Sequence, residues 1–179
     1  MNKKTLKEEK YEHITHPFPP LYDADSKILI LGSLPSVKSR EQMFFYGHPQ
    51  NRFWKVLAGV CQAEVPVSVE EKKAFLLANG IAVWDVIASC RIVGSSDSSI
   101  RDVVANDVAG LLQDSGIEAV FCNGAKSWEL YHRYCEKACQ REAGKLPSTS
   151  PANAAWSLER LIKSWGEALL PYVSSGRKG

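Results

Sequence analysis

Three short apolar runs along the chain are typical of strands that are buried on both faces. They span residues 27–31, which end at Gly32, residues 80–87, and residues 117–122, which end at Asn123 and Gly124. A continuous apolar run, in place of an alternating one, indicates the centre of a parallel sheet. We expect a fourth, shorter strand within residues 141–146.

Between these runs the apolar residues recur with the spacing of amphipathic helices. Helices are predicted over residues 51–61, 68–78, 99–113, 125–143 and 151–170. The second of them opens with Ser68 and has Glu71 three residues later, which is the spacing of a capping box. Strands that alternate with helices of this length predict an α/β fold, a three-layer α/β/α sandwich around a parallel sheet of four strands.

The length of 179 residues fits a single domain with one core. Residues 1–16 are polar and lack apolar periodicity, so we expect a flexible N-terminal arm there. We place the domain at residues 17–173, entered through the proline-rich stretch that begins at Pro17, and a flexible tail at residues 174–179.

Composition changes this picture little. Hydrophobic residues make up 45% and charged residues 23%, and no apolar run approaches the roughly 20 residues that span a bilayer. The lysine-rich start has no apolar stretch behind it, so no membrane association and a cytoplasmic location are expected, nucleoid-associated in a prokaryote. The net charge of +2 is too small to indicate nucleic acid by itself.

The five cysteines do not form a recognisable metal or disulfide pattern. Their number is odd, and only Cys135 and Cys139 lie close together in sequence. A zinc or iron–sulfur site needs more ligands at short spacing. We therefore predict structural cysteines, no bound metal and no cofactor.

Two loops carry the candidate chemistry, because ligands in open α/β sheets bind beyond the carboxyl ends of the strands. The first begins with Gly32-Ser33-Leu34-Pro35-Ser36 and continues through an aromatic segment, residues 44–54, which holds His48 and Asn51. Glycine after a strand allows a ligand close to the backbone, aromatic rings stack on bases, and asparagine hydrogen-bonds a base edge or a water.

The second loop, residues 146–153, has three hydroxyl residues, Ser148, Thr149 and Ser150, between two prolines at a predicted helix start. Hydroxyls and helix-start amides together suit a phosphate. Each loop also has a purely structural interpretation. Glycine and serine form ordinary turns after strands, and Ser-Thr-Ser-Pro is a common start of a helix.

The order of these motifs resembles the uracil-DNA glycosylase superfamily. The Gly-Xaa-Xaa-Pro loop followed by His48-Pro49-Gln50-Asn51-Arg52-Phe53-Trp54 is similar to the first motif of the mismatch-specific uracil and thymine glycosylases. Gly-Ser-Leu-Pro-Ser, with Leu-Pro-Ser-Thr-Ser-Pro-Ala later on, looks more like the hypoxanthine-DNA glycosylase branch. The resemblance runs from about Phe18 to Tyr172 and implies a four-stranded parallel sheet between helices.

One position departs from the mismatch-specific pattern. Those enzymes carry a catalytic asparagine two residues after the glycine, where this chain has Leu34, which cannot orient water. The hypoxanthine branch shares this loss and is thought to use the asparagine of the His-Pro-Xaa-Asn string, here Asn51. The resemblance therefore implies hydrolysis of the N-glycosidic bond of a deaminated base, with hypoxanthine preferred over xanthine and uracil.

The predicted site follows from this resemblance. The catalytic candidates are Asn51 and His48; the base-binding candidates are Tyr46, Phe45, Gly32, Ser33 and Leu34; the phosphate-binding candidates are Ser36, Ser148, Thr149 and Ser150. The partner is double- or single-stranded DNA with a deaminated base, bound by a monomer. No lysine lies where a Schiff base would form, since Lys38 and Lys55 only flank the first loop and Lys145 borders the second. We therefore expect an abasic product without strand cleavage.

Two other functions fit the same residues. One is excision of uracil or thymine from mismatches with guanine, which Leu34 disfavours. The other is a catalytically inactive DNA-binding module on the same fold. A phosphate-binding α/β protein unrelated to DNA would leave the segment Phe45 to Asn51 without a purpose.

Overall fold

The main sheet has four parallel strands, as the apolar runs predict. The computed structural model describes residues 10–173. Its strands are β2 (Ile28–Gly32), β3 (Ile81–Asp85), β6 (Ala119–Asn123) and β7 (Gly144–Leu146), in the order β3-β2-β6-β7. Every residue of β2 is buried, because β2 lies inside the sheet and both of its faces are covered.

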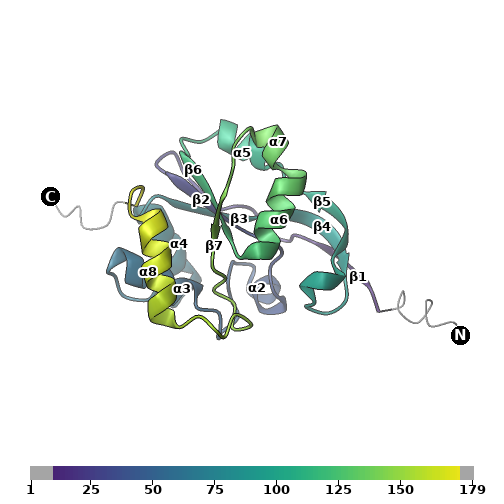
Figure 1. Cartoon of the computed structure of the whole chain (residues 1–179), viewed down its shortest axis with the longest axis horizontal. Helices are drawn as coiled ribbons and strands as arrows, with labels where there is room; N and C mark the ends of the chain where they lie inside the picture. The colour runs from purple at the N-terminus through teal and green to yellow at the C-terminus, as the bar shows by residue number, and fades with distance from the viewer. Residues whose placement is uncertain (1–9, 174–179) are drawn as a thin grey trace, which may run out of the picture.

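Helices cover both faces of this sheet and complete the three-layer sandwich (Figure 1). On one face lie α3 (Phe53–Cys61), α4 (Val69–Ala78) and α8 (Leu158–Leu169). On the other lie α5 (Val108–Gln113), α6 (Ala125–Tyr134) and the short α7 (Glu136–Cys139). Alternate residues of β2 enter the two cores, Ile28 and Ile30 on the α3–α8 side and Leu29 and Leu31 on the other. The predicted fold class is confirmed.

A second, antiparallel sheet was absent from the prediction. It contains β1 (Glu12–Thr15), β4 (Ile87–Ile92) and β5 (Arg101–Ala105), with β4 in the centre. The chain leaves β3 at Asp85, bends at Val86 and enters this sheet, so the single run predicted at 80–87 belongs to two sheets.

The N-terminal boundary needs a correction. Residues 12–15 were expected in a flexible arm, yet they form β1 and pair with β4, with Ile14 opposite Cys90. The next residue, His16, donates its backbone N–H to Ala88 and so extends this contact. Only one side chain of the strand is buried, which is why no apolar pattern revealed it. Residues 1–9 of the expected arm, and the expected tail at residues 174–179, lie outside the described residues.

The helix predicted at 99–113 is wrong in its first half. Ile100, Val103 and Val104 have helical spacing, but residues 101–105 form β5 at the edge of the second sheet. The positive φ of Asp102 and the irregular register with β4 are properties of a bulged strand. Pairing with β4 has overridden the local pattern, and the helix begins only at Val108.

Two other predicted helices begin or end elsewhere. The one at 125–143 ends at Tyr134 and is followed by the short α7. The one at 151–170 begins at Leu158, because Ser157 is its N-cap and accepts the backbone N–H of Arg160. Residues 151–156 are therefore free to form turns beside the site. The predicted cap of α4 is present, since Ser68 accepts the N–H of Glu71.

Four of the five cysteines are buried, and all five are free thiols. Burial raises the pKa of Cys61 to about 11 and is the main cause that raises the pKa of Cys122 and of Cys135 to about 12 each. These groups pack as small apolar side chains. Within residues 10–173, no helix combines the length and the hydropathy that a membrane crossing requires.

Candidate functional site

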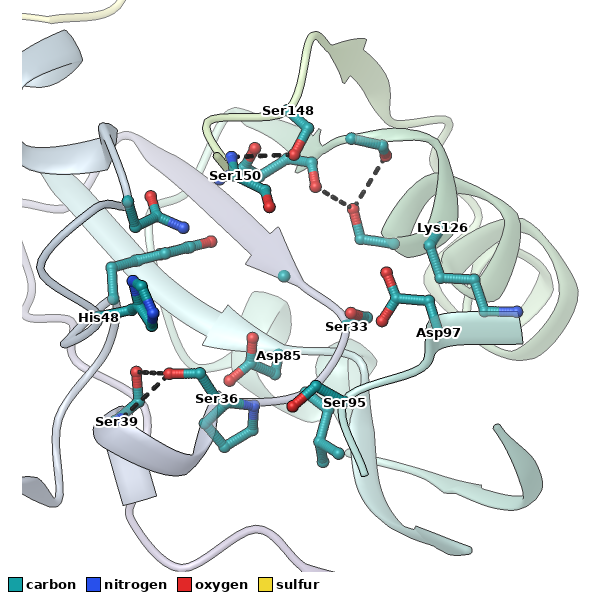
Figure 2. A pocket seen from close by; sticks show the side chains of 18 of the residues that line it. Ser33, Ser36, Ser39, His48, Asp85, Ser95, Asp97, Lys126, Ser148 and Ser150 are labelled. Atoms are coloured by element: carbon teal, nitrogen blue, oxygen red, sulfur yellow. Dashed lines mark hydrogen bonds between the residues drawn. The ribbon is translucent and has the colours of Figure 1, made fainter. Parts of the chain in front are cut away.

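A pocket of about 500 Å³ lies at the carboxyl ends of the parallel strands. Gly32 ends β2, Asp85 ends β3 and Asn123 ends β6, and all three line it. Figure 2 shows serine side chains of two separate loops on opposite walls, Ser36 on one and Ser148 with Ser150 on the other. The pocket is thus where an open parallel sheet places a ligand.

All eleven residues proposed from the sequence lie in the wall of this pocket. They are Gly32, Ser33, Leu34, Ser36, Phe45, Tyr46, His48, Asn51, Ser148, Thr149 and Ser150. The fold therefore brings together two loops that are about a hundred residues apart in sequence.

Asn51 is held by a hydrogen-bond network whose directions are fully determined. Its Oδ1 accepts the backbone N–H of Phe53 at 3.0 Å, and therefore must be the carbonyl oxygen. Thr149 Oγ1 donates to the same oxygen at 2.8 Å and accepts from Asn123 Nδ2 at 2.9 Å. Asn123 Oδ1 in turn accepts the backbone N–H of Thr149 at 3.1 Å.

This network decides which group Asn51 offers to a ligand. Both bonds to Asn51 end on its carbonyl oxygen, while its Nδ2 has no hydrogen-bond partner among the described residues. A primary amide with an occupied oxygen presents N–H donors. Asn51 can hold a water or a base atom as a donor, but it does not offer a free acceptor.

Thr149 differs from the role expected of it. It is fully buried, and its hydroxyl both donates to Asn51 and accepts from Asn123. We therefore assign it to positioning Asn51, and not to a phosphate. The neighbouring hydroxyls remain suitable for an anion. Within residues 10–173, Ser148 Oγ accepts only the N–H of Ser150, and Ser150 Oγ only that of Ala152, so each O–H is free to donate to a ligand.

Ser36 has a structural task as well as a place in the wall. Its Oγ accepts the backbone N–H of Ser39 and caps α2 (Val37–Gln42), while Ser39 Oγ accepts the N–H of Gly47. These contacts tie the start of the first loop to its aromatic part. Leu34 lines the pocket but also packs against the core beside β4.

Arg52 fastens the two loops to each other, which the sequence did not reveal. Its guanidinium donates to the carbonyl oxygens of Ser150 and Asn153 at 3.0 and 3.1 Å, and also to that of Trp156. Its backbone N–H donates to Thr149 at 3.0 Å. Planar guanidinium groups satisfy several carbonyls at once, so one side chain fixes the turns at 150–156.

His48 has one ring nitrogen occupied. Its Nδ1 accepts the backbone N–H of Gln50 at 3.1 Å, which places the proton of the neutral ring on Nε2. In Figure 2 the imidazole stands in the pocket wall, on the side of the first loop. His48 is thereby suited to donate a hydrogen bond from Nε2.

The two aromatic candidates are placed differently. The ring of Tyr46 stacks on Phe53 with 3.8 Å between centroids, and its backbone has a φ of 51°, which is uncommon for a tyrosine. Phe45 is almost fully buried and meets Phe18 edge-on. Backbone conformations of this kind persist where surrounding contacts fix them, often at functional sites.

Asp85 is a functional candidate that we did not predict. It is buried at the end of β3, lines the pocket and receives His16 Nε2 on its Oδ2 at 2.7 Å. Asn106 fixes the same strand end by donating to the backbone oxygens of Asp85 and Ile87. A lone aspartate inside an apolar run was the available signal, because a buried carboxylate requires a partner.

A further wall comes from the segment after β4 and from the first turn of α6. It includes Ser95, Asp97 and Lys126, none of which was predicted. Burial raises the pKa of Asp97, and the charge of Lys126 partly opposes this. A lysine therefore lies beside the pocket, and Figure 2 shows its side chain pointing away from the pocket centre.

No cluster of three or more histidine, cysteine or acidic side chains that would suit a metal ion occurs in residues 10–173. The polar side chains of the pocket are hydroxyls, amides, one imidazole, the carboxylates of Asp85 and Asp97, the guanidinium of Arg40 and the amine of Lys126.

Comparison with known proteins agrees with this geometry. The model of the uracil DNA glycosylase superfamily matches residues 19–169. A hypoxanthine DNA glycosylase of Methanosarcina barkeri is 34% identical over 154 residues, which cover 84% of this chain and 95% of the relative. One of Methanosarcina acetivorans is 36% identical over 149 residues, or 82% and 93% of the two chains.

A solved structure shares the fold as well. It is a solution NMR structure from Methanosarcina acetivorans, provisionally named a uracil DNA glycosylase, with a TM-score of 0.72 and 35% identity. The likeness covers 85% of this chain and 93% of that one. With a family match over most of its length, this chain belongs to the uracil DNA glycosylase superfamily.

Proposed function

We propose that the protein is a monofunctional DNA glycosylase that removes a deaminated base, hypoxanthine in preference to xanthine and uracil, and leaves an abasic site. One observation carries the proposal. Asn51, whose carbonyl oxygen is doubly hydrogen-bonded, turns its free amide group to a pocket with room for a flipped base. The two relatives named hypoxanthine DNA glycosylase support the choice of base.

The DNA backbone would lie along the mouth of the pocket. Ser148 and Ser150 have O–H groups free to donate to phosphate oxygens, and Ser36 stands on the opposite wall. Contacts of this kind fix the register of the DNA without reading its sequence. The target nucleotide would then leave the stack, which costs a few kcal/mol and less for a mispaired base.

Tyr46 is the better stacking partner for the flipped base, because its ring is only partly buried and Phe53 covers just one of its faces. Phe45 is 2% exposed and packs against other aromatic rings, so it offers little free surface to a base. The backbone of Gly32, Ser33 and Leu34 would pass along the base, where the absence of a side chain on Gly32 leaves space.

The chemistry would divide between two side chains. As the bond to C1′ breaks, the sugar gains oxocarbenium character and the base gains negative charge. His48 Nε2–H would donate a hydrogen bond to the departing base, and the Nδ2 group of Asn51 would bind the attacking water through its oxygen. As the water oxygen bonds to C1′ and the bond from C1′ to the base breaks, the proton lost by the water ends on the base, which leaves neutral. A strongly electrophilic sugar reacts with a neutral water, provided that the water is well placed. The N–H donor of Asn51 is therefore sufficient to position the water, and no general base is needed to deprotonate it first.

The water mechanism predicts no covalent intermediate. Lys126 lies beside the pocket but points outward in Figure 2, so its amine would not reach C1′. Treatment of an active reaction with borohydride should trap no protein–DNA adduct. An adduct that disappears in Lys126→Ala would show instead that the enzyme uses a lysine and cuts the strand.

The experiment is a glycosylase assay on labelled duplexes that each contain one hypoxanthine, xanthine, uracil or ordinary base, with alkali to reveal abasic sites. Release should be fastest from hypoxanthine, absent from ordinary bases and lost in Asn51→Ala. The exposed amide of Gln113, at the end of α5, provides the control variant Gln113→Ala. Uracil or thymine release from guanine mismatches alone would favour the mismatch-specific alternative. DNA binding without any release would favour an inactive module.

A further inference from the structure

One cation in the wall of the pocket lacks a partner among the described residues. Arg40 belongs to α2, is partly buried and lines the pocket. Its Nε is enclosed and makes no hydrogen bond, and within residues 10–173 its guanidinium forms no ion pair. The pocket carboxylates do not supply its counter-charge, since Asp85 is bound by His16 and the charge beside Asp97 is that of Lys126. A partly buried charge without a counter-ion is costly, and it indicates an anionic ligand.

The side chain of Arg40 is held at the junction of α2 and β4. Arg40 lies one helical turn after Ser36, and its backbone N–H donates to the Ser36 carbonyl oxygen at 2.9 Å. Long side chains of a helix lean toward its first turn, so Arg40 extends along the wall that carries Ser36. Burial raises the pKa of Cys90 on β4, and the charge of Arg40 partly opposes this, so the guanidinium lies near that buried thiol. The stem of Arg40 is therefore enclosed by both elements.

Only the outer part of the guanidinium is open to a ligand. The terminal nitrogens, Nη1 and Nη2, have no partner among the described residues and, unlike Nε, are not enclosed. Two parallel N–H donors on a planar group suit the oxygens of a phosphate. A phosphate that binds them must come into the pocket, because the enclosed stem limits how far the head of Arg40 can extend outward.

We infer that Arg40 binds one backbone phosphate of the damaged strand, beside the target nucleotide, and does so only after this nucleotide has left the base stack. In an intact duplex the backbone would lie along the mouth of the pocket, where Ser148 and Ser150 can reach it. Flipping rotates the backbone inward and brings a phosphate to Arg40. The ion pair then forms in the flipped complex alone and offsets part of the cost of opening the duplex. This inference rests on the proposed function and names a contact that couples DNA binding to flipping.

Lys126 provides a contrast on another part of the wall. Its side chain points away from the pocket centre in Figure 2, so it can meet the backbone of any duplex. Lys126→Ala should therefore weaken binding to damaged and to undamaged DNA alike. A change at Arg40 should weaken only the complex in which a nucleotide is flipped.

The test measures affinity, so it does not depend on catalysis. Two duplexes of the same sequence are titrated into the full chain, one with a tetrahydrofuran abasic-site analogue and one with an ordinary base pair at that position. Arg40→Gln should bind the abasic duplex about 10-fold or more weakly than wild type does, because a charge-assisted contact is lost. Its affinity for the ordinary duplex should change by less than about 2-fold, since those phosphates stay outside the pocket. Equal losses on both duplexes would overturn the inference.

Neutral phosphate analogues identify the partner of Arg40. A methylphosphonate has nearly the shape of a phosphate but no charge, and it replaces the phosphates on both sides of the abasic site one at a time. At one position, wild type should lose about 10-fold in affinity and Arg40→Gln should lose little more, as expected for two groups in contact. Absence of such coupling at every phosphate beside the site would contradict the assignment.

The departing base also gains negative charge, so single-turnover release of hypoxanthine is measured alongside. If Arg40 served the base, Arg40→Gln would slow release and leave the affinity for abasic DNA, which has no base, unchanged. That result would overturn the inference.

Two further variants control for charge and for folding. Arg133→Gln removes an exposed guanidinium near the end of α6, which stacks on Tyr134 outside the pocket wall, and it should change neither affinity. If a thermal melt shows that Arg40→Gln does not fold, Arg40→Lys replaces it, because an ammonium loses the bidentate contact. This variant should weaken abasic binding alone, and the loss should shrink at the same methylphosphonate.

The failure of this inference and that of the proposed function give different results. Excision of hypoxanthine without coupling between Arg40 and any phosphate would refute the phosphate site and leave the proposed function intact. Coupling without excision of any base would refute the function and keep the phosphate site.

Discussion

At the scale of single residues, the pocket is organised by side chains that fix other side chains. Thr149 and Asn123 determine which atom Asn51 presents, and His16 does the same for Asp85. In both cases a buried polar group satisfies one side of its partner and leaves the other side for a ligand. Such supporting contacts set the precision of a site as much as the groups that touch the ligand.

Thr149→Val tests the support of Asn51. Valine has nearly the same shape, but it removes the donor to Asn51 and the acceptor for Asn123. Single-turnover excision should slow by about 10- to 100-fold, because the amide of Asn51 is no longer fixed in orientation. The concentration of DNA that half-saturates the rate should change little, since Thr149 has no free group for a phosphate.

Thr149→Ser is the control, because it keeps the hydroxyl and should retain most of the rate. If Thr149→Val weakens DNA binding and leaves the rate of bound complex unchanged, Thr149 contacts the backbone after all.

At the scale of elements, the site is assembled from loops that few contacts hold in place. The turns at 150–156 belong to no helix or strand, and Arg52 alone donates to three carbonyl oxygens in them. β1 is an edge strand of four residues that leads directly to His16. Both segments should therefore respond strongly to single substitutions.

Arg52→Lys removes the planar group but keeps the charge. A lysine cannot satisfy three carbonyls in the same plane, so the turns at 150–156 should loosen. Hydrogen exchange in these turns should become faster, and affinity for abasic DNA should fall by about 10-fold. Arg160→Lys, which alters a guanidinium that stacks on Trp156 nearby, is a control of the same type. Unchanged exchange in Arg52→Lys would refute the fastening role.

Ile14→Ala tests whether β1 belongs to the domain. Ile14 is 8% exposed and packs in the core beside β4. Its truncation should lower the free energy of unfolding by about 2 kcal/mol or more in urea denaturation. The exposed neighbour Glu12 gives the control Glu12→Ala, with an expected change below about 0.5 kcal/mol. Equal effects of the two changes would return residues 12–15 to a flexible arm.

At the scale of the whole molecule, the parallel sheet brings polar residues at its strand ends together in one pocket. The positive and negative charges of the protein as a whole are nearly balanced. The net charge is +2, and among the described residues the cationic side chains in the pocket wall are those of Arg40 and Lys126. Hydroxyls, backbone amides and these few charges must therefore hold the DNA. Binding of this kind releases few counterions.

A salt titration measures this directly. The logarithm of the binding constant for abasic DNA should fall with the logarithm of salt concentration with a slope of about −2, as for two neutralised phosphates. Lys126→Ala should reduce the slope by about 1. A slope of −6 or steeper would mean that an extended basic surface, and not the two loops, supplies most of the affinity.

The sequence predicted the architecture where the pattern was continuous. The apolar runs at 27–31 and 117–122 and the cap at Ser68 are reproduced, because burial on both faces and local capping are encoded in neighbouring residues. β1 and β5 were missed because pairing with β4, and not their own patterns, makes them strands.

The candidate site also contains residues that the sequence predicted and residues that only the structure revealed. Motif order brought out Asn51 and the two loops, yet Asp85, His16 and Arg52 gained their significance only from contacts over long separations in sequence. The free hydroxyls of Ser148 and Ser150 and the occupied one of Thr149 look alike in sequence, and only burial and partners distinguish them.

The central claim is that Asn51 acts through its amide N–H in releasing a deaminated base. The most direct measurement is single-turnover release of hypoxanthine from duplex DNA by wild type, Asn51→Ala and Asn51→Asp, with binding to abasic DNA measured alongside. Aspartate can keep both bonds to Phe53 and Thr149 but offers no N–H to the pocket. We predict release by wild type, a loss of at least about 100-fold in both variants, and retained DNA binding. Release by Asn51→Asp at the wild-type rate, or by Asn51→Ala at any comparable rate, would contradict it.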